Sequence, residues 1–305
     1  TAQRGPFVIA PPTGVTFVSG QDVNYDGSVL LFADGYVQRP AQANGQVIID
    51  KSYRWTAEGG FQDIGQAVTD LTPDPAALRK IGVVGEAISG DGNTIAGNWY
   101  DTRIGLPTLT ALPSSEGGFR WTASSGLQKL PHLSASPLGV TITNDPSSSG
   151  PYSSVSGISR DGATIVGQSR GSNGLVQATY WREGTATGLG FLTGFTPTET
   201  ARYSKFATNA LAASADGSVI VGQMENSDDG SAWRWSSSTG MQDLNVLATN
   251  AGINLNGFTL ADAASVSDNG QFITGTAFKR ASDGIGLLGQ FGYVLSIGAA
   301  PITPT

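Results

Sequence analysis

Short apolar runs, each about the length of a β-strand, alternate with glycine-rich turns along most of the chain. The clearest signal is a Ser-x-Asp-Gly turn between two apolar runs, which is typical of a β-hairpin. The five copies, some with a substituted position, are Asn24–Gly27, Ser89–Gly92, Ser159–Gly162, Ser214–Gly217 and Ser267–Gly270. A repeat of this kind indicates a fold assembled from copies of one unit.

A second recurring element is a strand with a Trp near its end. Its copies contain Trp55, Trp121, Trp181 and Trp235. An Ile-Val-Gly type run lies between the turn and this strand, as in Thr164–Gly167, and a segment of alternating apolar and polar residues follows the Trp. Each unit therefore predicts four strands: one on either side of the turn, the Trp strand and the alternating strand.

These units predict an all-β fold, a five-bladed β-propeller built from four-stranded antiparallel blades. Such sheets repeated around an axis are the blades of a propeller, and propellers have roughly 4 to 8 of them. The chain would then form a single domain over residues 1–305. The predicted blades span about 15–66, 80–132, 150–192, 206–246 and 260–298.

The fifth unit has a third strand at Gly292–Leu295 but no segment for a fourth. An apolar run, Phe7–Ala10, precedes the first unit. Because an unpaired sheet edge promotes aggregation, we predict that residues 6–10 complete the last blade and close the ring. The repeat also predicts that the Trp of each of the first four units, and Leu295 in the fifth, occupy equivalent buried sites.

Together, the Arg-Trp strand, the Gly-Leu-Gln segment at 126–128 and the hairpin at 158–167 resemble the HAF family of extracellular repeats, over nearly the whole chain. The chain departs from the motif that names the family, since no His precedes the Ala-Phe or Gly-Phe position in any copy. The resemblance implies an exported protein, secreted or on a bacterial cell surface, that is similar to the passenger domains of autotransporters. It implies no particular activity.

Composition removes several classes of function. The net charge is −7 and the sequence contains no cluster of Lys or Arg, so we expect no nucleic-acid partner. With no Cys and one His, the chain cannot build a thiolate or histidine metal site, and we expect neither a metal ion nor another cofactor. No apolar run is long enough to span a membrane, and we expect a monomer.

All the long connections are predicted at one end of the blades, opposite the short Asp-Gly turns. They cover about 33–50, 66–84, 98–117, 131–152, 192–207, 245–260 and 276–289. Loops on a rigid scaffold carry function, so this long-loop face is the predicted binding surface. The adjacent aromatic residues Trp99 and Tyr100 suit stacking on a sugar ring. The ligand-binding candidates are Trp99, Tyr100, Arg103, Tyr152 and Asn209.

Acidic residues just before three of the turns are predicted to line a central channel near the same face. They are Asp22, Glu86 and Asp262. Converging carboxyl groups can act as acid and base on a glycosidic bond. The sequence therefore leaves three hypotheses: a non-catalytic protein that binds a glycan or another extracellular partner, a polysaccharide hydrolase or lyase, and a structural spacer on a cell surface.

Overall fold

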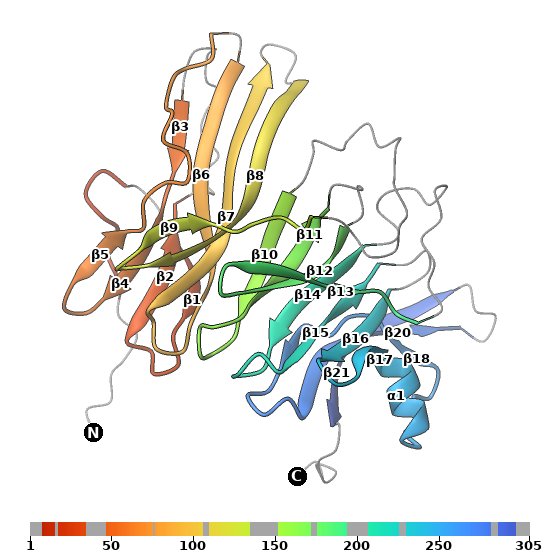
Figure 1. Cartoon of the computed structure of the whole chain (residues 1–305). Helices are drawn as coiled ribbons and strands as arrows, with labels where there is room; N and C mark the ends of the chain where they lie inside the picture. The colour runs from red at the N-terminus through yellow and green to blue at the C-terminus, as the bar shows by residue number, and fades with distance from the viewer. Residues whose placement is uncertain are drawn as a thin grey trace.

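A computed structural model of the chain is built almost entirely from β-strands (Figure 1). It describes residues 8–15, 18–34, 47–75, 77–105, 110–134, 152–171, 176–193, 207–225, 230–281 and 286–296. Within these residues the strands form five sheets, numbered here in chain order.

Three of the sheets are four-stranded and antiparallel, with the strands in chain order. Sheet 1 contains β1 (Ser19–Val23), β2 (Val29–Ala33), β4 (Ser52–Thr56) and β5 (Gly60–Asp63). Sheet 3 contains β10 (Tyr152–Ile158), β11 (Ile165–Arg170), β12 (Val176–Arg182) and β13 (Thr185–Gly190). Sheet 4 contains β14 (Thr208–Ala213), β15 (Val219–Met224), β16 (Ser231–Ser236) and β17 (Gly240–Asp243). The predicted all-β fold with four-stranded antiparallel sheets is confirmed.

Sheets 2 and 5 depart from the simple unit. In sheet 2, a strand from the first unit, β3 (Val47–Asp50), pairs in parallel with β6 (Ala77–Ile88) and precedes β7 (Thr94–Gly105), β8 (Thr110–Thr122) and β9 (Gly126–Lys129). In sheet 5, the first strand is broken into β18 (Phe258–Leu260) and β19 (Ser265–Val266), which both pair with β20 (Phe272–Arg280), and β21 (Leu287–Ser296) follows.

A short helix, α1 (Leu244–Asn250), joins sheets 4 and 5. It begins where the Asp243 carboxylate accepts hydrogen bonds from the backbone N–H groups of Asn245 and Val246, which have no partner inside the helix. No helix in the described part of the chain is long and apolar enough to cross a membrane.

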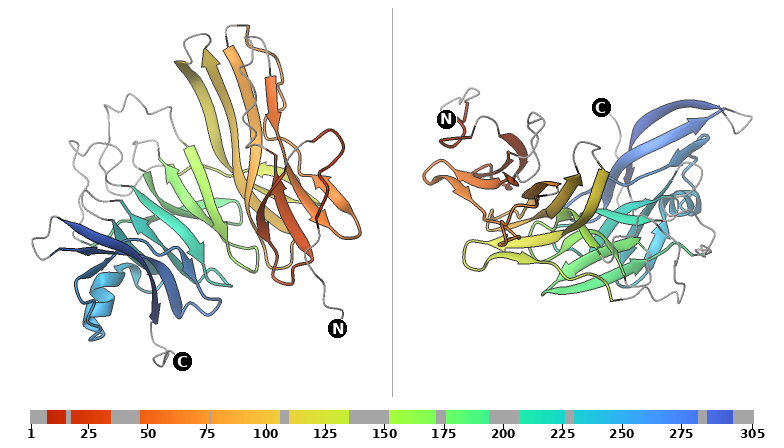
Figure 2. Two further views of the ribbon diagram at one scale, coloured as in Figure 1. Left: turned by 180° about the vertical axis from the view of Figure 1, so that it is seen from behind. Right: turned by 90° about the horizontal axis from the view of Figure 1, so that it is seen from above.

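The sheets stack face to face along an arc that runs from sheet 1 to sheet 5 (Figure 2). The hydrophobic core lies between them. Ile95 and Trp121 of sheet 2 pack against Leu31 of sheet 1, and Trp181 of sheet 3 packs against Leu130, which follows sheet 2. Sheets 2 and 3 thus turn their Trp faces toward the sheet before them.

The four repeated Trp residues hold equivalent positions in their sheets. Each pairs with the apolar residue that follows its Asp-Gly turn, in the pairs Trp55–Leu30, Trp121–Ile95, Trp181–Ile165 and Trp235–Ile220, and Leu295 pairs likewise with Ile273. Trp121 and Trp181 are buried as predicted, with 4% and 1% of their surface exposed, and Leu295 is buried too.

The predicted burial is wrong for Trp55 and Trp235, which are only half-buried. Trp55 belongs to sheet 1, which begins the arc. At sheet 4 the space between sheets is filled by the fully buried Trp233, and Trp235 lies beside it against the ring of Tyr180, 5.7 Å between centroids.

The predicted closure of the last sheet by the N-terminal segment is wrong for the residues described. Val8–Ala10 lie outside any strand and Val8 is 96% exposed, whereas β21 pairs with β20 alone; Phe7 lies outside the described residues. Pro11 and Pro12 follow this run, and a proline has no N–H to donate to a neighbouring strand. The run is therefore too short to form a fourth strand.

The ends of the arc are linked instead through the Asp-Gly turns. Backbone hydrogen bonds join successive turns, from Tyr25 N–H to Gly90 O (3.2 Å), Gly90 N–H to Arg160 O (2.8 Å), Asp161 N–H to Ala215 O (3.0 Å) and Ala215 N–H to Asp268 O (3.0 Å). The guanidinium of Arg160 lies 3.1 Å from the ring centroid of Tyr25 in sheet 1 and forms an ion pair with Asp268 in sheet 5. Arg160 thus connects the first, third and fifth sheets.

Candidate functional site

The polar side chains of the Asp-Gly turns form hydrogen bonds within the turns themselves. In the second turn, the Ser89 hydroxyl donates to the Asp91 carboxylate (2.6 Å), which also accepts from the backbone N–H of Asn93 (3.0 Å). Gly92 has a φ of +71°, a conformation that residues with a Cβ avoid. These bonds lower the pKa of Asp91. Among the described residues, no three acidic or histidine side chains gather in a way that could hold a metal ion.

Trp99 and Tyr100 lie in a strand, not in a loop. The predicted long loop 98–117 is mostly the outer part of the β7–β8 hairpin, which projects beyond the other sheets together with β6 (Figure 1). The prediction fails because the strand formers Trp99, Tyr100, Thr102 and Ile104 continue β7 beyond the point where the repeat pattern ends. Residues 276–289 likewise contain parts of β20 and β21, and 245–260 contain α1.

Trp99 belongs largely to the core. Its side chain is 9% exposed and packs in the same hydrophobic cluster as Val83 and Phe119. The ammonium of Lys129 lies over its ring, 3.8 Å from the centroid. One face of the ring is therefore covered by the Lys129 ammonium.

One cavity of about 380 Å³ brings three of the predicted binding residues together between sheets 2 and 3. These are Trp99 and Tyr100 on β7 and Tyr152 on β10. The remaining lining residues are Asn98, Glu116, Gly117, Ser153, Ser154, Gln168 and Arg170. The cavity thus combines aromatic rings with hydrogen-bonding side chains from both sheets.

The other two binding candidates lie elsewhere. Arg103 lies further along β7, where its guanidinium is 3.8 Å from the carboxylate of Asp74. Asn209 lies on β14 and accepts a hydrogen bond from the Ser156 hydroxyl (3.4 Å). Neither lines the cavity.

Arg170 is a cavity residue that the sequence did not single out. It ends β11 directly opposite Tyr152, and its guanidinium lies 4.7 Å from the centroid of that ring. Its buried Nε–H donates to no group among the described residues. Burial raises the pKa of Tyr152, against the effect of the nearby Arg170 charge. Counting residues outward from the Asp161–Gly162 turn would pair Tyr152 with Gly171, because the bulge between Val155 and Gly157 shifts the register by one residue.

Tyr100 is fixed at the edge of the cavity by a buried carboxylate. Its hydroxyl donates to Asp50 on β3, and the ammonium of Lys80 forms an ion pair with the same carboxylate (2.7 Å). The Lys80 ammonium also lies over the Tyr100 ring, 5.5 Å from its centroid. The parallel pairing of β3 with β6 is what brings Asp50 to this position.

The three acidic candidates are each engaged in local contacts. Asp22 accepts from the backbone N–H groups of Val23 and Ile88, both at 2.8 Å, and so bridges sheets 1 and 2. Asp262 accepts from the N–H of Thr276 (3.1 Å) within sheet 5. Neither lines the cavity between sheets 2 and 3.

Glu86 lies at a bulge of β6, between Gly85 and Ala87. It accepts a hydrogen bond from the amide of Asn98 (3.2 Å), and burial raises the pKa of its carboxyl. The Asn98 amide also bonds both backbone groups of Val155 on sheet 3, at 2.8 and 3.1 Å. Glu86 therefore helps to orient a residue that joins the two sheets and also lines the cavity.

No family model matches the chain, and no curated protein matches it. Among solved structures, TolB from Acinetobacter baumannii is similar at 16% identity, over 92% of this chain and 54% of that chain, with a TM-score of 0.41. A putative TolB from Agrobacterium tumefaciens is 12% identical over 93% and 91% of the two chains, with a TM-score of 0.39. The β-propeller domain of the Trilobed protease from Pyrococcus furiosus, which has an open velcro topology, is 9% identical over 95% and 85%, with a TM-score of 0.35. The chain spans about half the length of the first of these, and superpositions this loose carry no function across.

Proposed function

We propose that the chain is an exported five-bladed β-propeller domain that binds an oligosaccharide in the cavity between sheets 2 and 3. The observation that supports this most is the lining of the cavity, which sets Tyr100 and Tyr152 beside amide, hydroxyl and guanidinium groups. A sugar needs both, because its C–H faces pack on aromatic rings while its hydroxyls form hydrogen bonds. A volume of about 380 Å³ suits a small ligand.

The Arg170 donor favours an acidic sugar, beside the one carboxylate of the lining, Glu116. The Arg170 guanidinium lies in the cavity with an Nε–H that bonds no described residue. A carboxylate can accept two parallel hydrogen bonds from a guanidinium, which gives both strength and orientation. A uronic acid unit would place its carboxylate on Arg170 and its ring near Tyr152. Export is proposed from the resemblance to extracellular repeats, and cell fractionation tests it.

Binding without catalysis is the better supported of the sequence hypotheses. A glycosidase needs two carboxyl groups, about 5 to 9.5 Å apart, flanking the scissile bond. Glu116 is the one carboxylate among the residues that line this cavity, and Asp22, Glu86 and Asp262 lie outside its lining. The hypothesis of a structural spacer, in turn, gives no role to the aromatic and hydrogen-bonding side chains that line this cavity.

Calorimetric titration of galacturonate and neutral oligosaccharides into the wild-type protein tests the proposal. We expect the acidic oligosaccharide to bind and Arg170→Gln to weaken binding by about tenfold or more, because a charge-assisted hydrogen bond is lost. Arg103→Gln is the matched control, since Arg103 lies outside the cavity. The proposal is wrong if no oligosaccharide binds, or if the two variants lose affinity equally.

A further inference from the structure

The outer edge of sheet 5 is open in the described structure. In each of the first four sheets a fourth strand pairs with the Trp strand, whereas β21, which holds the place of the Trp strand in sheet 5, pairs with β20 alone. In the view from above, β20 and β21 lie at the free end of the arc (Figure 2). One side of β21 therefore presents backbone N–H and C=O groups that no described strand pairs.

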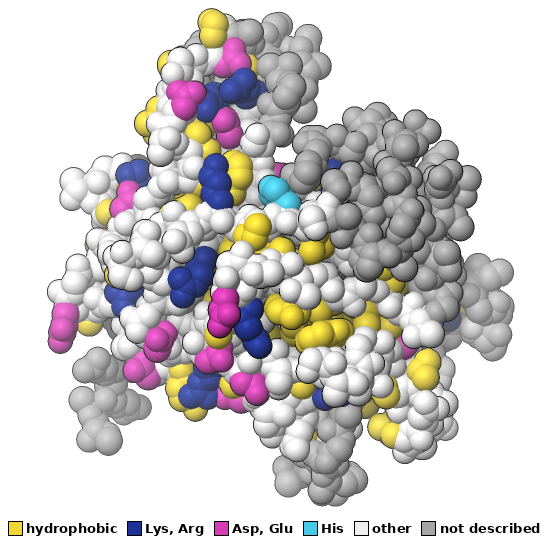
Figure 3. All heavy atoms as spheres, in the orientation of Figure 1, with side chains coloured by type: hydrophobic (Ala, Val, Ile, Leu, Met, Phe, Trp, Pro, Cys, Tyr) yellow, Lys and Arg dark blue, Asp and Glu magenta, His cyan; other side chains and the backbone are white. Residues whose placement is uncertain are grey.

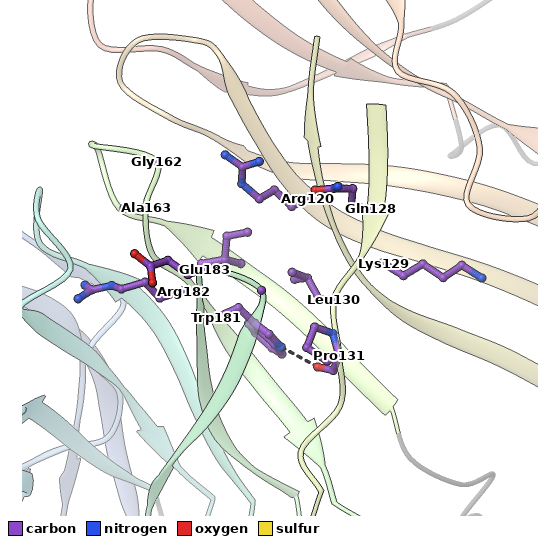
Figure 4. A pocket seen from close by; sticks show the side chains of 12 residues that line it. Arg120, Gln128, Lys129, Leu130, Pro131, Gly162, Ala163, Trp181, Arg182 and Glu183 are labelled. Atoms are coloured by element: carbon purple, nitrogen blue, oxygen red, sulfur yellow. Dashed lines mark hydrogen bonds between the residues drawn. The ribbon is translucent and has the colours of Figure 1, made fainter. Parts of the chain in front are cut away.

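Sheets 2 and 3 show what a fourth strand contributes. Gln128 of β9 pairs with Arg120 of the Trp strand, and Leu130 and Pro131 follow β9 directly. Figure 4 shows both beside Trp181, which is buried and donates its Nε1–H to the Pro131 carbonyl at 2.8 Å. The fourth strand thus pairs the edge of its own sheet and leads the chain over the core of the next. The described part of sheet 5 has neither.

The strand β21 lacks the features that normally keep an edge from pairing with another chain. Those features are short length and charged side chains. The fourth strands of sheets 1, 2 and 4 have both, since each is four residues long and ends in a charged residue: Asp63, Lys129 and Asp243. The strand β21 has ten residues and no charge. Four of its apolar side chains are 47% to 63% exposed: Leu287, Leu288, Phe291 and Val294.

The surroundings of β21 also permit contact with another acidic protein. Lys279 and Arg280 belong to β20, one strand away from the open edge. The helix α1, which packs in the same hydrophobic cluster as sheet 5, contains no charged residue. In the space-filling view, hydrophobic and uncharged polar side chains lie over α1, whereas charged side chains gather over sheets 1 to 3 (Figure 3). The net charge of −7 would oppose contact between two copies at a charged face, but it does so least here.

From the open edge, its exposed apolar residues and its lack of charge, we infer that β21 pairs with β21 of a second copy. The two strands run antiparallel, and the two copies are related by a twofold axis. Each copy offers this edge once and uses it in the contact, so the assembly closes at a dimer. The inference differs from the monomer expected from the sequence, and it does not depend on the proposed oligosaccharide site.

The symmetry restricts the register of the pairing. A twofold axis between antiparallel strands requires one residue to lie opposite its own copy. With Phe291 in that place, Leu288 lies opposite Val294, so that the two most exposed side chains of β21 cover one another. The bulge next to Leu288 ends the regular stretch of the strand.

Analytical ultracentrifugation over a range of protein concentrations tests the dimer. We expect the wild type to have twice the mass of one chain. Val294→Lys should weaken the dimer by about tenfold or more, because it buries an ammonium against Leu288 at two symmetric places. Val23→Lys is the matched control, since Val23 is 49% exposed on β1 at the other end of the arc, and it should leave the dimer unchanged.

A charge exchange tests the register. Leu288→Glu alone should also give monomers. An equal mixture of Leu288→Glu and Val294→Lys should restore dimers, because the register sets the two new charges, which are opposite in sign, across from one another.

Three results would overturn the inference. One is a wild type that stays monomeric at every concentration, which would leave the edge to a strand of another protein. Another is that Val294→Lys and Leu288→Glu, both folded as judged by circular dichroism, dimerise as the wild type does. The third is that the mixture of the two variants stays monomeric, which would contradict the antiparallel pairing centred on Phe291.

Discussion

At the scale of single residues, the repeated polar side chains maintain the fold. The Ser and Asp of each turn bond one another and the turn backbone, and Arg54 extends a hydrogen bond to the turn of the next sheet. Arg170, which lines the cavity together with Tyr100 and Tyr152, has a buried Nε–H without a partner in the described chain, as do buried polar atoms outside the cavity such as Arg234 Nε and Gln177 Nε2.

The turn carboxylates make stability depend on acid pH. The backbone N–H of Ser218, helped by the hydroxyls of Ser218 and Ser214, lowers the pKa of Asp216 from 3.8 to about 2. A carboxyl with a lowered pKa in the folded state stabilises the protein fully above its unfolded pKa, and this contribution is lost as pH falls toward 2. Asp216→Asn should therefore melt below the wild type near neutral pH. Thermal melts from about pH 6 to about pH 2 should show that gap closing with acid, and a constant gap would contradict the assignment.

At the scale of strands and sheets, the parts set by local pattern could be predicted from the sequence. The hairpins follow from their Asp-Gly turns and the Trp strands from their alternation. The parallel strand β3 could not be predicted, because it pairs with β6, a strand distant in the sequence, and the local residue pattern does not indicate that pairing. The helix α1 was missed because the cap at Asp243 lies at the end of a strand-like segment.

The same limit applies to the candidate site. The sequence singled out Trp99, Tyr100 and Tyr152, which line the cavity, from their type and position, although their placement on strands was not predictable. Arg170 depends on the strand register opposite Tyr152, and Arg103 lies outside the cavity because it is further along the β7–β8 hairpin. Side-chain type thus suggests candidates, and pairing decides which of them meet.

Packing between sheets predicts unequal effects for two equivalent Trp residues. Trp121 is buried between sheets 1 and 2, so Trp121→Ala should lower the free energy of unfolding by about 3 to 5 kcal/mol. Trp55 is half-buried in the first sheet, so Trp55→Ala should cost clearly less. Urea unfolding followed by circular dichroism measures both. Equal losses would show that sheet 1 is covered as fully as sheet 2.

At the scale of the whole molecule, the arc is held together at its turn end. Backbone hydrogen bonds link the first turn to the fifth in series, and Arg160 joins the two ends of this series by contacting both Tyr25 and Asp268. The opposite end carries the extended strands of sheet 2, and no strand of the described chain joins β21 to sheet 1 there. The contacts between sheets at the turn end follow from where the short turns lie.

Removing Arg160 should therefore loosen the arc as a whole. Arg160→Ala should lower the melting temperature and broaden the distance between sheets 1 and 5, since it deletes both contacts. Arg160→Lys keeps the charge but loses the planar stacking on Tyr25, so its melting temperature should lie between those of the wild type and Arg160→Ala. The chain has no Cys, so a pair of introduced cysteines can carry spin labels for distance measurement. An unchanged distance distribution in Arg160→Ala would mean that the backbone bonds alone hold the turns.

The crystal structure of the protein with a galacturonate oligosaccharide is the most direct test of the proposed function. The account predicts a sugar in the cavity lined by Tyr100, Tyr152 and Arg170, with its carboxylate on Arg170 and its ring against Tyr152. A sugar bound over the Asp-Gly turns at the opposite end, or an empty cavity in crystals saturated with the oligosaccharide, would contradict it.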